Sequence, residues 1–317
     1  MKTIAFVLLA LVLPSVFAAG SVNWVGELAP AQAALAKADY PTAYTEYLRV
    51  ADHNPLAQFT LGQFHQNGWG RAPDKAGACA WYEKAAQRHI PAAEHAWADC
   101  LAQGIGHAVD LPAAMGWYEK AASHGHLISW CSEADHYIRG DGVAKDIARG
   151  ITLCMQAAQA NSPPAMLKLA RYFQQGRDVP QDLAAARHWY AQAAQSHVNE
   201  AQYQLGLMLA NGEGGDEDGK GALFWFETAA SEGYVPAYLV TAMLYANAPV
   251  QKETGALTPE QLAKVYLWTE AAKARSIGPE QQAQADKLEA QVLSVMPATW
   301  RGELDKKIAE HLAKYPR

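Results

Sequence analysis

The residues whose spacing comes nearest to known chemistry are Asp216, Asp218, Gly221 and Glu227. They fit most of a calcium-binding loop, in which alternating carboxylates, a glycine and a final glutamate surround the ion. Lys220 stands in the middle of this loop, at a position where the ion needs an oxygen ligand. The sequence therefore predicts no calcium site and leaves Asp218 for another role.

Two other clusters of titratable side chains could serve a metal or a proton transfer. His124 and His126 stand close together, but no cysteine or carboxylate accompanies them at the sequence spacing of a zinc site. Glu133, Asp135 and His136 share one turn of a predicted helix, and we interpret them as a hydrated or groove-lining polar cluster. The sequence also lacks a nucleophile elbow, a phosphate-binding glycine loop and an HExxH motif. We therefore expect no enzyme activity, no cofactor and no metal.

The elements that must position any site recur along the chain with a period of 36 residues. The recurring aspartates are Asp74, Asp110, Asp146, Asp182 and Asp218; the glycines are Gly68, Gly104, Gly140, Gly176 and Gly212; and the small residues are Ala57, Ala93, Ser129, Ala165, Ala201 and Ala237. A fixed period of this length is typical of a solenoid, in which each unit buries its apolar face only against its neighbours. Solenoids usually act through an extended binding surface.

A single repeat, residues 201–233, indicates two helices. Its first helix ends at Gly212, since glycine takes the left-handed conformation at low cost, and Asp218 caps the second helix, which ends at Gly233. The helix-ending column reads His53, His89, Gly125, Asn161, His197 and Gly233 in successive repeats. Histidine and asparagine tolerate a positive φ better than most residues, so we interpret these histidines as turn formers rather than metal ligands.

Two further columns predict how the helices pack. Small residues that let the two helices of a hairpin approach closely are Gly62, Ala98, Ala134, Ala170, Gly206 and Ala242. Large residues predicted to pack in the core are Trp81, Trp117, Leu153, Trp189 and Trp225. Both columns favour an all-α solenoid of helix hairpins.

Departures from the pattern mark the ends of the array, where terminal repeats must cover the core. Residues 19–54 predict an N-terminal capping hairpin, and residues 55–277 hold the repeats. Thr258 and Gln261 predict a capping box at the start of a late helix. Residues 278–317 predict C-terminal capping helices.

Residues 1–18 are predicted to be a cleavable signal peptide, because Lys2 precedes an apolar run and Val16 and Ala18 stand at the positions before the cut. No cysteine follows the predicted cleavage site, and no later segment of the sequence is apolar for long enough to span a bilayer. We expect a periplasmic protein, with secretion as the alternative, that is a monomer when alone. The formal net charge of −6 argues against nucleic acid as a partner.

The four cysteines could form disulfides in an oxidising compartment. Cys79 and Cys100 flank one predicted turn about equally, and Cys131 and Cys154 flank another. In antiparallel hairpins such residues stand at similar heights, which a disulfide needs but which does not ensure that the side chains face each other. We predict these two bonds, with buried free thiols as the alternative.

The strings WYEKAA at Trp81 and Trp117, WYAQAA at Trp189 and AQYQLGLMLANGEG at Ala201 closely resemble the Sel-1-like repeat family, relatives of the tetratricopeptide repeat. The resemblance implies a right-handed α/α superhelix of about six to seven 36-residue helix hairpins, with capping helices at both ends and the first helices on the concave face. Similar proteins in bacterial envelopes are adaptors, and some neutralise toxins of rival cells. Some cysteine-rich relatives have been described as penicillin-binding or weakly β-lactam-hydrolysing, but no catalytic motif of theirs can be placed in this sequence.

On this implied concave face, polar residues in the first half give way to apolar residues in the second. The predicted partner-binding residues are Asp135, Arg139 and Arg171, followed by Tyr203, Leu207, Asn211, Leu239, Met243 and Asn247. The carboxamides could hydrogen-bond an extended peptide, or could merely finish their helices. We expect an exported scaffold or adaptor that binds another protein or peptide in this groove. The alternatives are an immunity protein for a toxin delivered to the periplasm, and a weak cell-wall or β-lactam amide hydrolase.

Overall fold

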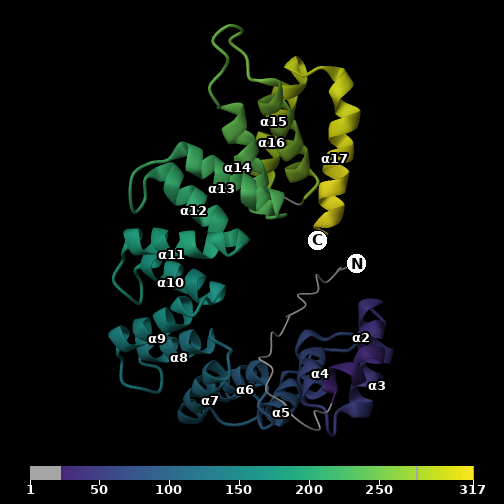
Figure 1. Cartoon of the computed structure of the whole chain (residues 1–317), viewed down its shortest axis with the longest axis vertical. Helices are drawn as coiled ribbons and strands as arrows, with labels where there is room; N and C mark the ends of the chain where they lie inside the picture. Colours follow the sequence, from purple (N-terminus) through teal and green to yellow (C-terminus); the bar gives the residue numbers. More distant parts are fainter. Residues whose placement is uncertain (1–22, 276–277, 317) are drawn as a thin grey trace. The chain divides into compact units, whose positions relative to one another are not determined.

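The computed structural model describes residues 23–275 and 278–316, and this part of the chain is all-helical. Within these residues there are seventeen α-helices, one short 3-10 turn and no strand. Consecutive helices fold back on one another as hairpins (Figure 1). The prediction of an all-α solenoid is confirmed, whereas the predicted signal peptide, residues 1–18, lies outside the described residues.

The described residues divide into two compact units, 23–168 and 169–316, with the boundary inside α10. The first unit contains α1 (Trp24–Glu27), α2 (Ala29–Ala36), α3 (Tyr40–Val50), α4 (Pro55–Asn67), α5 (Lys75–Ala86), α6 (Pro91–Gln103), α7 (Leu111–Ser123), α8 (Ser129–Arg139), α9 (Ile147–Gln159) and the start of α10 (Pro163–Gln175). The second unit contains the rest of α10, then α11 (Leu183–Gln195), α12 (Asn199–Asn211), α13 (Gly219–Ser231), α14 (Val235–Ala246), α15 (Pro259–Lys273), α16 (Pro279–Val295), η1 (Ala298–Trp300) and α17 (Arg301–Lys314).

The repeating aspartates and glycines mark where the helices of each hairpin begin and end. All five aspartates accept a hydrogen bond from the backbone N–H three residues further on, at 2.8 to 3.0 Å. Each bond satisfies a backbone donor that the first helical turn leaves without a partner. The five glycines that end the first helices have φ between 62° and 78°, the left-handed conformation. The predicted caps are therefore confirmed.

The column of histidine, asparagine and glycine takes a positive φ at five of its six positions, namely His89, Gly125, Asn161, His197 and Gly233. His53 is the exception, and the prediction for it is wrong. After α5, the N–H of Ile90 reaches back five residues to the carbonyl of Ala85, a closure that a left-handed residue allows. After α3, the N–H of Asn54 reaches back only four residues, to Val50, so no left-handed residue is needed there.

The buried aromatic column lies one residue after the predicted one. Its large rings, which are 1 to 4% exposed, belong to Tyr82, Tyr118, Tyr190 and Phe226. Each tryptophan of the predicted column is only partly buried. At Trp81, for example, the Nζ of Lys84 lies 4.2 Å from the ring centroid. The prediction that the tryptophans form the core is therefore wrong, because the next residue in the helix is the one that faces the neighbouring helix of the hairpin.

Different devices close the two ends of the helical array. Asp39 begins α3 by accepting a hydrogen bond from the N–H of Thr42 at 3.2 Å. Thr258 and Gln261 form the predicted capping box at the start of α15. Beyond it, α15, α16 and α17 share a hydrophobic cluster whose buried members are Val265, Tyr266, Val292, Met296, Leu304 and Ile308. This cluster holds the last two long helices against α15.

Candidate functional site

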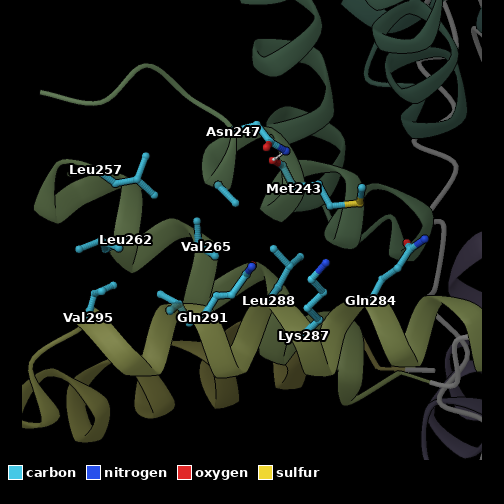
Figure 2. Close-up of a pocket in the computed structure, with 12 residues that line it drawn as sticks. Met243, Asn247, Leu257, Leu262, Val265, Gln284, Lys287, Leu288, Gln291 and Val295 are labelled. Atoms are coloured by element: carbon cyan, nitrogen blue, oxygen red, sulfur yellow. Dashed lines mark hydrogen bonds between the residues drawn. The ribbon is translucent and has the colours of Figure 1, made fainter. Parts of the chain in front are cut away.

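A pocket of about 580 Å³ opens between α14, α15 and α16 (Figure 2). Its lining residues are Met243, Ala246, Asn247, Leu257, Leu262, Val265, Gln284, Lys287, Leu288, Gln291, Val292 and Val295. Most of these side chains are aliphatic, and the polar ones come mainly from α16. The pocket is therefore an apolar cavity with a partly polar border.

The sequence of α16 builds one wall of this pocket. Gln284, Leu288, Gln291 and Val295 recur at steps of three and four residues, which places them on one face of the helix. Figure 2 shows Lys287, Leu288 and Gln291 pointing from α16 toward α14. The side chains of Gln284, Lys287 and Gln291 are exposed, whereas Leu288 is partly buried. Apolar contact area thus lies beside hydrogen-bonding groups and one positive charge.

Two of the predicted binding residues line this pocket. Met243, which is 37% exposed, projects from α14, and Asn247 is the residue that caps the C-terminal end of this helix (Figure 2). The Nδ2 of Asn247 donates to the carbonyl of Met243 at 2.8 Å, which fixes the carboxamide at the end of the helix. Leu239 was expected on the same surface, and this expectation is wrong. It is 6% exposed, because it packs in a core cluster with Trp268 and Ala272 of α15.

The other predicted apolar residues, on α12, do not line the pocket. The ring of Tyr203 packs against Phe226 and Tyr234, with centroids 5.4 and 5.6 Å apart. Leu207 is partly buried, and Asn211 is exposed and donates to Glu213 at 3.3 Å. The structure therefore does not gather α12 and α14 residues into one cavity, and a binding role for the α12 residues stays a prediction.

The predicted polar residues form ion pairs within their own units. In the first unit, Asp135 pairs with Lys168 at 2.6 Å and with Arg139 at 3.3 Å. In the second, Arg171 binds Glu200 of α12 through two hydrogen bonds, and this bonding raises the pKa of the guanidinium. A partner that used these charges would have to compete with the pairs that already hold them.

The residues of the calcium-like loop are also engaged elsewhere. Asp218 caps α13, as predicted. Glu227 binds Lys264 and accepts a hydrogen bond from the hydroxyl of Tyr245 at 2.5 Å. The structure therefore gives Asp218 and Glu227 separate structural roles.

A hydrogen-bond network in the first unit contains the residue types of a hydrolase triad. The Oγ of Ser129 lies 2.9 Å from the Nδ1 of His95 and 2.8 Å from the Nδ1 of His126. The Nε2 of His95 is 3.6 Å from one oxygen of Asp99, whose other oxygen accepts from Tyr118 at 2.5 Å. Ser129 has no exposed surface, so a substrate carbonyl has no path to its Oγ in this structure. The arrangement is a structural network.

The electrostatics of this network follow from burial. Burial, together with the neighbouring His95, lowers the pKa of His126 to about 4. Burial also lowers the pKa of His95, against the opposing effect of Asp99. Both imidazoles are thus neutral near neutral pH. Since a serine hydroxyl has one proton, Ser129 donates to one of them and accepts from the other.

A second histidine cluster, which the sequence did not predict, surrounds Glu94 in the first turn of α6. Its carboxylate has no exposed surface. The Nδ1 of His124 lies 2.8 and 2.9 Å from the two carboxylate oxygens, and the Nδ1 of His89 lies 3.5 Å from one of them. The sequence offered His124 no carboxylate at the spacing of a zinc site, but the fold brings one to it. That carboxylate stands 30 residues earlier in the chain, in the first turn of the other helix of the same hairpin, and only the folding of α6 against α7 brings it close.

Both predicted cysteine pairs lie at disulfide distance. The Sγ atoms of Cys79 and Cys100 are 1.99 Å apart, and those of Cys131 and Cys154 are 1.90 Å apart. The first pair joins α5 to α6, and the second joins α8 to α9. The first pair therefore links the second helix of one hairpin to the first helix of the next, whereas the second pair links the two helices of one hairpin.

Helix hairpins at a constant period define the class of α-solenoid repeat proteins. Within this class, five segments of the chain match the Sel1 repeat, at residues 55–89, 91–126, 134–162, 163–197 and 199–234. The chain belongs to the Sel1 repeat family. None of the helices in the described part combines the length and apolar character that crossing a membrane requires.

The chain is similar to several solved structures of bacterial proteins. A Sel1 repeat protein from Oxalobacter formigenes is 26% identical, with a TM-score of 0.57, over 78% of this chain and 99% of that one. The protective antigen c5321 of uropathogenic Escherichia coli is 20% identical, with a TM-score of 0.54, over 86% of this chain and 56% of that one. The immunity protein Pa5087 from Pseudomonas aeruginosa is 17% identical, with a TM-score of 0.43, over 76% and 82%. No curated protein sequence matches the chain.

Proposed function

We propose that this chain is an exported scaffold or adaptor of the bacterial envelope that binds another protein and carries out no chemistry of its own. The observation that carries the proposal is the pocket between α14, α15 and α16, an apolar cavity bordered by carboxamides and a lysine. The predicted leader at residues 1–18 and the two cysteine pairs at disulfide distance support export to an oxidising compartment.

The pocket suits a peptide segment of a partner protein. An aliphatic side chain of the segment would be desolvated among Met243, Leu262 and Leu288, and a few such anchors usually supply most of the binding energy. The carboxamides of Asn247 and Gln291 would hydrogen-bond the backbone of the segment. Lys287, which is exposed at the border of the pocket, would favour a segment with an acidic residue beside its anchor.

Affinity capture from an envelope extract tests this proposal. The bait is the full chain without its predicted leader. A second bait, the pocket variant, carries Met243→Glu and Val295→Glu, which place charges in the pocket. The control is Val109→Glu, because Val109 is as exposed, at 59%, as Val295, at 63%, but lies outside the pocket. We expect the pocket variant to lose partner binding at least about tenfold while its thermal melt stays near the parent. Binding that survives in the pocket variant and disappears in the control would contradict the proposal.

The identity of the captured protein separates the scaffold role from its alternatives. A resident envelope protein supports a scaffold, whereas a toxin from another cell would assign the narrower role of an immunity protein. Turnover of nitrocefin by the purified chain would overturn the non-catalytic part of the proposal. We expect no turnover of nitrocefin, because Ser129 is buried.

A further inference from the structure

The carboxylate of Glu94 is fully buried and contacts two imidazoles. Among the described residues, its ion-pair partners are His89 and His124, and no lysine or arginine is one of them. Burying an ionised carboxylate is costly unless a counter-charge or several hydrogen bonds compensate it. The positive end of α6 supplies part of this compensation, because Glu94 lies in the first turn of that helix. A cation shared by the three side chains would supply the rest.

The chain contains its own comparison for this cluster three repeats later. His197, Gln202 and Glu232 occupy the same columns as His89, Glu94 and His124. There the buried side chain is an amide, and Gln202 donates to Glu232 at 3.2 Å while His197 contacts the same carboxylate at 2.8 Å. Amide and imidazole groups thus compensate the Glu232 carboxylate without an ion, while the Oε1 of Gln202 has no hydrogen-bond partner among the described residues. In the first cluster, Glu94 stands in the column of Gln202, and His124 stands in the column of Glu232. The amide donors are therefore absent there, and a second imidazole nitrogen is present.

We propose that His89, Glu94 and His124 bind a divalent transition metal ion, with Zn²⁺ as the best fit. Two imidazole nitrogens and one carboxylate oxygen are a ligand set that zinc accepts, with a water molecule in the fourth position. The three ligand atoms lie within 4.8 Å of one another. Ligand atoms on a tetrahedral zinc ion stand about 3.3 Å apart, given bonds of about 2.0 to 2.2 Å. The Oε1 of Glu94 lies 2.9 Å from the Nδ1 of His124 and 3.5 Å from the Nδ1 of His89, separations close to this value.

The two imidazoles of the cluster are open to solvent, from which the ion and its water would enter. The side chains of His89 and His124 are 74% and 40% exposed, while Glu94 closes the inner side. The three ligands come from the turn after α5, the first turn of α6 and the C-terminal end of α7. A bound ion would therefore tie consecutive hairpins together on the surface of the first unit. This role is independent of the pocket on α14–α16.

Zinc titration of the full chain without its predicted leader or any affinity tag tests the site. We expect calorimetry to show one equivalent of Zn²⁺ binding, and added Zn²⁺ to raise the melting temperature of the parent. Glu94→Gln and His89→Asn should each weaken binding by at least about tenfold. Both variants should fold, because glutamine occupies the Glu94 column at Gln58 and Gln202 and asparagine occupies the His89 column at Asn161.

The matched control is His197→Asn, the same change in the corresponding cluster, which should bind Zn²⁺ like the parent. Melts of the metal-free variants verify that each one is folded. If Glu94→Gln proves unfolded, His124→Ser decides, since serine occupies that column at Ser196. The proposal is overturned if the parent takes up no Zn²⁺ at micromolar concentrations. It is also overturned if folded Glu94→Gln, or His124→Ser in its place, binds as tightly as the parent.

Discussion

The ring of Tyr82 occupies the space that a side chain at Gly62 would need. A Cβ at position 62 would stand 2.3 Å from the Cε1 of Tyr82, which is far inside van der Waals contact. Phe226 lies against Gly206 in the same way, at 2.9 Å. The small residue of the first helix and the buried ring of the second are therefore one packing unit, which sets how closely the two helices approach.

We expect Gly62→Ala to lower the free energy of unfolding by about 1 to 3 kcal/mol, because the added methyl group forces Tyr82 out of its place. Urea unfolding followed by circular dichroism measures this change. Gly116→Ala is the matched control, since a Cβ there meets nothing within 4 Å and lies inside α7. That variant should gain about 0.5 to 1 kcal/mol from the better helix propensity of alanine. Equal effects of both substitutions would show that the contact with Tyr82 does not restrict position 62.

A second prediction distinguishes the two aromatic columns. Tyr190→Ala should cost about 3 to 5 kcal/mol, because it removes a buried ring whose hydroxyl donates to Gln174 at 2.7 Å. Trp189→Ala should cost clearly less, since Trp189 is only partly buried. Denaturant melts of the two variants, measured side by side, give the comparison. A larger loss for Trp189→Ala would restore the tryptophan column as the core.

These two columns show what the sequence could and could not predict. The caps at Asp74 and Gly68 depend on residues within a few positions, so the repeat pattern was sufficient to place them. The choice between Trp189 and Tyr190 depends on the rotation of a helix against its neighbour, and both residues recur at the same period. Burial of Leu239 depends on α15, where the repeat pattern no longer holds.

The candidate sites were harder to predict for the same physical reason. Lys287 and Gln291 lie on α16, outside the columns, so no repeat signal marked them as part of the pocket. Glu94 and His124 meet only because α6 and α7 fold back on each other as one hairpin. The repeat does contain a signal for the contact between Glu94 and His124. Gln202 and Glu232 occupy the same two columns three repeats later, and they also contact each other.

The third prediction concerns the oxidation state of the four cysteines. Non-reducing peptide mapping should recover bonds that pair Cys79 with Cys100 and Cys131 with Cys154. Reduction should lower the free energy of unfolding, by about 2 to 4 kcal/mol for each bond. Four alkylatable thiols in periplasmically produced material would contradict the pairing, and so would a peptide that links Cys100 to Cys131.

The fourth prediction is an acid-sensitive stability that arises from His126. Its pKa falls from an ordinary 6.5 to about 4 in the folded chain, mainly because burial disfavours the charged ring. Because the folded pKa is the lower one, the stabilising contribution is complete above pH 6.5 and is lost as the pH falls toward 4. At 1.36 kcal/mol per pKa unit, the loss is at most about 3 kcal/mol. His126→Gln should therefore flatten the pH dependence of unfolding over this range.

Glu133 provides a control of opposite sign. Burial, aided by Glu119, raises its pKa from 4.5 to about 6, so the neutral carboxyl is favoured in the folded chain. Its contribution is present below pH 4.5 and is lost as the pH rises through about 6. Acidification thus stabilises the chain at Glu133 while it destabilises the chain at His126. Glu133→Gln should make the acid loss steeper, and His126→Gln should make it shallower, in urea melts at matched pH values. If both variants change the slope in the same direction, burial at these two positions does not control the acid response.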